Sequence, residues 1–296
     1  MKSTIFTGLN KRVKGLYARH YSWMKKTVFD IDELQKLIPL FRGRIGRFLG
    51  KLTLKYLCID KVNTLHSTHC HKRGAEFTSA VLSDPSVNIR YHIHNKELLD
   101  NLPEGAFVTV SNHPIGSIDG VMLIDIFASR RPDFKVMVNG FLECIGALEN
   151  NFIPVKPDSK REKGNIENVN GVRACLAWLK EGHPLGFFPA GAISSYRKDK
   201  KEVCDLPWAE NIIRLVRKTK VPVYPVLFDC YNSRFFYWLG KLSWKIRQLR
   251  IPAEVFNKKG KVMNIYIGRP ITPEAITGLS DKELSVLLYN HTYKLK

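Results

Sequence analysis

From about residue 90 onward, short apolar runs with the length of β-strands alternate with longer runs of helical periodicity. The strand-like runs are residues 106–111, 134–138, 152–155, 185–188, 221–228 and 262–267, and the helical runs are 120–128, 166–181, 207–219 and the stretch after 280. A helix between successive strands lets those strands run parallel and covers the faces of their sheet. The sequence therefore predicts an α/β fold with a mostly parallel central sheet flanked by helices.

The residues before this alternation form a different kind of segment. Residues 1–62 contain 14 Lys and Arg against 4 Asp and Glu, which is half of the net charge of +20. Apolar residues recur at helical spacing between the basic ones. We predict a basic N-terminal helical segment that faces a membrane in residues 1–80, followed by one α/β domain in residues 81–296.

Aromatic residues lie among the basic residues of this segment and of a second one, residues 233–261. Helices of this kind often lie in a lipid interface, where aromatic rings meet the headgroups. The residues predicted to contact a membrane are Trp23, Phe235, Phe236, Trp238 and Trp244. The competing interpretation is that these rings pack against the main domain.

No apolar run approaches the roughly 20 residues that a spanning helix needs. The N-terminus lacks the apolar core of a signal peptide. The six cysteines show no C-x-x-C spacing and are expected to be free thiols in a reducing compartment. We expect a cytoplasmic protein that lies on the inner face of the cell membrane.

The residues that point to chemistry follow the strand-like run 106–111. Asn112 and His113 enter a turn that contains Gly and Pro, and Asp119 comes in the first turn of the next helix. The carboxyl edge of a sheet is where α/β enzymes build their sites. A carboxylate bonded to one imidazole nitrogen fixes the tautomer and leaves the other nitrogen to take a proton. No G-x-S-x-G is present, so the pair is expected to act on a bound hydroxyl or amine without a covalent intermediate.

The run Asn-His-Pro-Ile-Gly-Ser-Ile-Asp-Gly (112–120) resembles the first motif of the glycerolipid (lysophospholipid) acyltransferase superfamily, and most of all its bacterial hemolysin-like branch. Residues 138–156, 187–194 and 221–226 resemble the second, third and fourth blocks in the correct order. Two shorter runs, 205–208 and 231–233, also look like that branch. The resemblance extends from about residue 30 to about residue 275.

The resemblance implies transfer of a fatty acyl chain from a thioester of acyl carrier protein or coenzyme A to the hydroxyl of a lyso-lipid. His113 would be the general base and Asp119 the residue that orients it. No bound cofactor and no metal is implied. The residues expected to bind substrate are Asn112, Pro114, Gly116, Ser117, Gly120, Phe188, Pro189, Ala190, Gly191 and Ser194.

The third block departs from the superfamily, which has Glu and Arg where this chain has Ala190 and Ile193. In relatives that make phosphatidic acid, that Arg is credited with holding the acceptor phosphate, and an Ile cannot do so. The acceptor is therefore expected to be a lyso-amino-acid lipid or lysophosphatidate. The nearby Arg197, Lys198 and Lys200 are candidates for a substitute cation.

The main alternative is a non-enzymatic basic protein that binds a membrane or nucleic acid. We expect no nucleic acid, because no recognition fold appears and the basic residues cluster with aromatic ones. The expected partners are an anionic membrane surface, the thioester donor and the lyso-lipid acceptor. His66, His69, Cys70 and His71 match no standard zinc pattern, so we expect no metal there.

Overall fold

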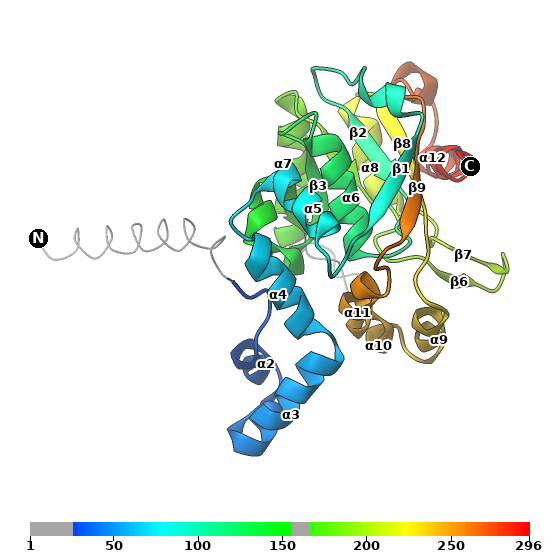
Figure 1. The fold of residues 1–296 in the computed structure, drawn as a ribbon. Coiled ribbons are helices and arrows are strands. Elements are labelled where there is room, and N and C mark those ends of the chain that lie inside the picture. Colours follow the sequence, from blue (N-terminus) through cyan, green and yellow to red (C-terminus); the bar gives the residue numbers. More distant parts are fainter. Residues whose placement is uncertain (1–25, 156–165) are drawn as a thin grey trace, which may run out of the picture.

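The computed structural model describes residues 26–155 and 166–296, and these residues contain a seven-stranded sheet in the order β1-β9-β8-β2-β5-β3-β4 (Figure 1). Its strands are β1 (Arg90–His94), β2 (Val108–Ser111), β3 (Lys135–Asn139), β4 (Phe152–Val155), β5 (Leu185–Phe187), β8 (Val223–Asp229) and β9 (Val262–Ile267). Neighbouring strands are parallel except β8 and β9. The predicted α/β fold with a mostly parallel sheet is confirmed.

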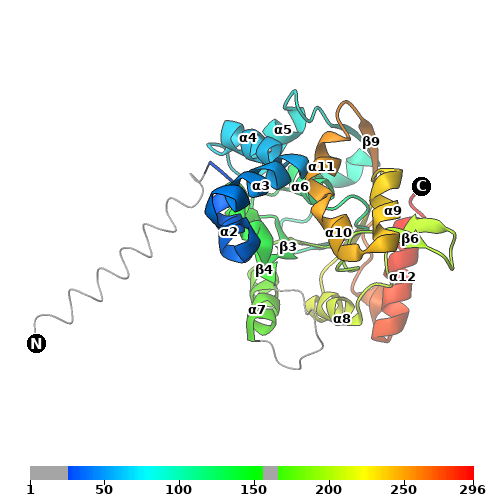
Figure 2. The same cartoon turned by 90° about the horizontal axis from the view of Figure 1, so that it is seen from below.

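Helices cover both faces of this sheet (Figure 2). One face packs against α5 (Gly74–Ser83) and α6 (Ser117–Ala128), the other against α7 (Ile166–Lys180), α8 (Glu210–Thr219) and α12 (Asp281–Tyr293). Every residue of β2 is buried as a result. Strands covered on both faces read as continuous apolar runs, and polar side chains concentrate where those strands end.

Two parts of the domain differ from the sequence prediction. A short hairpin of β6 (Ser195–Arg197) and β7 (Glu202–Cys204) extends from the body (Figure 1). The helix expected from residue 207 begins at Glu210, because the preceding residues bond to the third block: the amide of Ala209 donates to the carbonyl of Pro189 at 2.9 Å.

The N-terminal part consists of α2 (Ile31–Leu37), the 3₁₀ turn Pro39–Phe41, α3 (Gly43–Tyr56) and α4 (Ile59–His69). A capping box of Asp30 and Glu33 begins α2. Gly46 and Gly50 let α3 approach its neighbours, since a Cβ on either would lie 2.6 Å or less from another atom. The expected boundary at residue 80 falls inside α5, whose Phe77 and Val81 belong to the domain core.

Helices α9 (Arg234–Leu242), α10 (Trp244–Leu249) and α11 (Ile251–Phe256) lie on the same lower side of the molecule as α3 (Figures 1 and 2). Of the predicted membrane contacts here, Phe235, Trp238 and Trp244 are 44%, 51% and 58% exposed. The prediction for Phe236 is wrong. This residue follows Phe235 on α9 and faces the protein interior, so its ring is fully buried. Trp23 lies outside the described residues. Across those described ranges, no helix is both long and apolar enough to span a bilayer.

Candidate active site

His113 lies just beyond the carboxyl end of β2, in the loop that connects this central strand to α6. Its Nδ1 lies 3.1 Å from Oδ2 of Asp119, in the first turn of that helix. The side chain of Asp119 is fully buried, whereas that of His113 is 21% exposed. The pair predicted from the sequence is therefore brought together, with the imidazole as the member that a substrate can reach.

The Asp119 carboxylate is held in place by three backbone amides. Oδ2 accepts from Ile115 and Gly116 at 3.1 Å each, and Oδ1 accepts from Gly120 at 2.9 Å. The ring N–H of His113 does not point straight at Oδ2, so that contact is close but not a well-aligned hydrogen bond. Catalytic hydrogen bonds often align only when substrate is bound.

The surroundings raise the pKa of the His113 imidazole above its ordinary value of 6.5. Burial acts in the opposite direction and is the largest single influence, but the negative charge of Asp119, its contact with the ring and the charge of Asp205 together outweigh it. The imidazole is thus a stronger base than a free histidine.

Asp205 is a second buried carboxyl next to His113, and the sequence analysis did not assign it to the site. Its Oδ1 accepts from the backbone amide of His113 at 3.2 Å and from the hydroxyl of Ser194 at 2.5 Å. The indole of Trp208 donates to Oδ2 at 3.1 Å. Burial raises the pKa of Asp205, although these hydrogen bonds oppose the shift. Asp205 and Trp208 both belong to the run 205–208. The resemblance of this run to the family is the sequence feature that could have indicated their place in the site.

The predicted substrate-binding residues of the first block have different surroundings. The buried Asn112 exchanges two hydrogen bonds with the backbone of Phe228, at 3.0 and 2.8 Å, and so fixes the end of β2 to β8. Pro114 is also buried, whereas Ser117 and Gly120 are partly exposed. Asn112 therefore supports the loop rather than presenting its amide to a substrate.

The predicted residues of the third block lie beside the same loop. The ring of Phe188 packs on the imidazole of His113, with 4.4 Å between ring centroids. The amide of Ser194 donates to the carbonyl of His113 at 2.8 Å. Pro189 is buried, Ala190 is partly buried and Gly191 is exposed. The first and third blocks, far apart in the chain, thus form one site.

Gly116 has a backbone conformation that other residues rarely adopt, with φ of 92°. A Cβ there would lie 2.7 Å from Cδ1 of Ile193. We expect Gly116→Ala to lower the free energy of unfolding by about 1–3 kcal/mol or more, because strain and overlap add. Urea unfolding would measure this. Gly120→Ala is the matched control: its nearest neighbour would be 4.0 Å away, and the change should not destabilise the helix. Equal losses in both variants would contradict the assignment.

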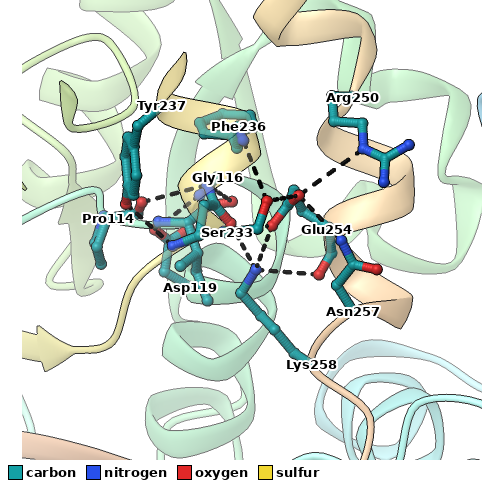
Figure 3. A network of polar contacts seen from close by, with 12 residues as sticks. Pro114, Gly116, Asp119, Ser233, Phe236, Tyr237, Arg250, Glu254, Asn257 and Lys258 are labelled. Atoms are coloured by element: carbon teal, nitrogen blue, oxygen red, sulfur yellow. Dashed lines mark hydrogen bonds and ion pairs between the residues drawn. The ribbon is translucent and has the colours of Figure 1, made fainter. Parts of the chain in front are cut away.

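A buried polar network contacts the His113 loop (Figure 3). The amide of Asn232 reaches the carbonyls of Pro114 and Ile115 at 3.5 and 3.4 Å. Lys258 donates to Asn232 Oδ1 at 2.5 Å and lies 3.4 Å from Oε2 of Glu254. Burial would raise the pKa of Glu254, but hydrogen bonds from Ser233 and the charge of Lys258 outweigh it and lower that pKa. Burial lowers the pKa of Lys258, and the charge of Glu254 opposes that shift without overcoming it.

Removing the cation from this network leaves a buried charge without its partner. We expect Lys258→Met to lower the free energy of unfolding by about 3–5 kcal/mol, as for other buried pairs with one member removed. Thermal and denaturant unfolding would measure the loss. The exposed neighbour Lys259, changed to Met, serves as control, and the double variant Glu254→Gln/Lys258→Met should recover part of the loss. Unchanged stability in Lys258→Met would show that the ion pair does not brace the loop.

Two of the three cations named as candidates to replace the missing arginine bond other side chains. Arg197 bonds the carboxylate of Asp199 at 2.8 and 3.0 Å, and Lys200 bonds the hydroxyl of Tyr289 at 3.0 Å. Lys198 is exposed on the hairpin.

Among residues 26–155 and 166–296, no three His, Cys, Asp or Glu side chains form a group suited to a metal ion. His69 instead pairs with Asp84 at 2.8 Å.

Comparison with known proteins identifies the family. A sequence model described as acyltransferase matches residues 40–296. Lyso-glycine lipid O-acyltransferase from Bacteroides thetaiotaomicron is 28% identical over 256 residues, which cover 82% of this chain and 88% of the relative. The protein of the same name from Phocaeicola vulgatus is 27% identical over 259 residues, with coverage of 83% and 87%.

The crystal structure of the 1-acyl-sn-glycerophosphate acyltransferase PlsC from Thermotoga maritima aligns with a TM-score of 0.48 at 15% identity, covering 96% of this chain and 95% of that one. The family model covers most of the chain, so the resemblance to the acyltransferase superfamily is confirmed and the chain belongs to the acyltransferase family.

Proposed function

We propose that the protein transfers a fatty acyl chain from a thioester of acyl carrier protein or coenzyme A to the hydroxyl of a lyso-lipid, in membrane lipid biosynthesis. The observation that carries this proposal is the His113–Asp119 pair at the carboxyl end of the central strand, with Nδ1 facing a buried carboxylate at 3.1 Å. Because Asp119 takes one ring nitrogen, Nε2 is the nitrogen that faces the acceptor hydroxyl.

In the proposed reaction Nε2 of His113 takes the hydroxyl proton while the acceptor oxygen attacks the thioester carbonyl. The tetrahedral intermediate expels the thiolate, which recovers the proton from the imidazolium. An ester and a free thiol result, and no metal or bound cofactor takes part. The amides of Ile115, Gly116 and Gly120 already donate to Asp119, so the oxyanion of the intermediate needs donors from other positions.

For the acceptor we propose a lyso-amino-acid lipid in preference to lysophosphatidate. The chain has Ala190 and Ile193 in the third block, so it lacks the arginine that holds phosphate in phosphatidic-acid-forming relatives. Both curated relatives carry the name lyso-glycine lipid O-acyltransferase. Both observations support the same acceptor class.

An acceptor panel with purified protein tests the function. Lyso-glycine lipid, lysophosphatidate and water would each be offered with an acyl-carrier-protein thioester and with a coenzyme A thioester, and products would be identified by mass spectrometry. We expect acylated lyso-glycine lipid as the main product. Thioester hydrolysis alone would identify a hydrolase, and transfer only to lysophosphatidate would overturn the acceptor assignment.

We also propose that residues 1–80 and the α9–α10 region hold the enzyme on the anionic inner face of the cell membrane. Exposed apolar side chains on α3 alternate with basic ones, and α9 and α10, which carry the exposed Trp238 and Trp244, lie on the same side of the molecule (Figures 1 and 2). Apolar and cationic side chains together match a lipid interface. Vesicles with and without phosphatidylglycerol would test this by co-sedimentation. Binding to DNA but to neither vesicle would favour the non-enzymatic alternative.

A further inference from the structure

Arg247 on α10 is a buried arginine without an anionic partner in the described chain. It is 8% exposed. The ion pairs among described residues do not include it, whereas Nε of Arg250, three residues later, lies 4.0 Å from Glu254 (Figure 3). Burial lowers the pKa of Arg247, and no carboxylate opposes that shift. A buried charge left in this state is costly unless something pairs with it.

The hydrogen bonds of this guanidinium are also incomplete. Nη1 reaches the carbonyl of Ser194 at 3.4 Å and Nη2 that of Ile193 at 3.3 Å, both long for such bonds. Nε is buried and has no acceptor. The guanidinium also lies over the ring of Phe236, 5.3 Å from the ring centroid. Of the five N–H donors of an arginine, two find acceptors among residues 26–155 and 166–296.

The position of Arg247 links it to the active site. Ser194, whose carbonyl accepts from Arg247, donates its own amide to the carbonyl of His113 at 2.8 Å. The side chain of Ile193, the other residue bonded to Arg247, lies against Gly116 in the His113 loop. A single residue, Ser194, therefore links the guanidinium by hydrogen bonds to the backbone of His113.

We propose that Arg247 binds the anionic group of the acceptor, a carboxylate or a phosphate, while the acceptor hydroxyl lies at His113. The planar guanidinium suits two parallel bonds to such an oxyanion. The ligand would supply the negative charge that the described chain does not. This assignment rests on the proposed function and adds the subsite that selects a charged acceptor.

The experiment compares lyso-glycine lipid with its methyl ester and with lysophosphatidate, in neutral detergent micelles. We expect Arg247→Met to lower kcat/KM for the free carboxylate by about tenfold to a hundredfold, with the methyl ester changed by less than about twofold. Arg247→Lys should fall between wild type and Arg247→Met. Lys282→Met, an exposed change of the same charge on α12, outside the region proposed to bind the membrane, should leave all three acceptors unaffected.

The ratio of carboxylate to ester turnover does not depend on how much of a variant is folded. If Arg247→Met loses no turnover relative to the ester with either the carboxylate or lysophosphatidate, the subsite is overturned and Arg247 only supports residues 193 and 194. A selective loss with lysophosphatidate alone would support the subsite and identify phosphate as its ligand. If wild type acylates none of the three acceptors, the proposed function fails and the subsite fails with it.

Discussion

Replacing His113 by alanine is expected to lower kcat for acyl transfer by about 10²- to 10⁴-fold, the range that a positioned general base contributes. Without the imidazole the acceptor hydroxyl keeps its proton and attacks the thioester poorly. The KM values should change little, since in the proposed mechanism the ring contacts the reacting hydroxyl rather than the bulk of either lipid chain. Steady-state kinetics with the acceptor found in the panel would measure both constants.

The fold should survive this change, because the His113 side chain is partly exposed and donates no hydrogen bond on which a strand depends. Circular dichroism and the thermal unfolding midpoint would check that. His183→Ala is the matched control: its Nδ1 also pairs with a carboxylate, Asp133 at 2.7 Å, but it lies outside the site. Near-normal transfer by His113→Ala would refute the mechanism, as would an equal loss in His183→Ala.

The sheet could be predicted because the pattern that defines it is local. Runs such as 106–111 and 262–267 are apolar over the length of a strand, and the helices between them repeat at helical spacing. The order of the strands depends on contacts between distant residues. Nothing in residues 90–94 and 262–267 alone indicates that β1 and β9 pair in parallel, or that β9 runs antiparallel to β8.

The same distinction holds for the site. His113 and Asp119 are close in sequence and belong to one motif, so their pairing was predictable. Asp205 bonds the loop from a position about 90 residues away, and Lys258, about 140 residues away, acts on it through Asn232. Their roles follow from burial and long-range hydrogen bonds. For Asn112 the motif was misleading. Its place in the motif suggested contact with substrate, but its side-chain amide is hydrogen-bonded to the backbone of Phe228.

Exposure along the aromatic segment was predictable only in part, for a related reason. Phe235 and Phe236 are adjacent and chemically identical, yet one is exposed and the other lies beneath the guanidinium of Arg247. Successive residues on a helix point about 100° apart, so the phase of the helix decides which ring faces the protein. That phase is set by packing of α9 against α10 and β6 and does not follow from composition.

Asp119→Asn is expected to reduce kcat by about 10²- to 10⁴-fold, comparable with an Asp-to-Asn change behind a catalytic histidine in other enzymes. The two carboxylate oxygens accept three backbone amides. An asparagine has one oxygen, so its NH₂ must face a backbone N–H in either orientation. The loop then shifts, and the imidazole loses the partner that fixes its tautomer.

The pH profile separates this role from simple damage to the loop. His113 must be neutral to act as a base, so kcat/KM rises with pH through its pKa, which the surroundings hold above 6.5. Burial lowers that pKa and the Asp119 charge raises it, so removing the charge should move the acidic limb to lower pH even as the plateau falls. Asp205→Asn should shift the limb in the same direction by less, since Asp205 bonds only the His113 backbone. A limb unmoved in Asp119→Asn would mean that Asp119 stabilises the loop without tuning the base.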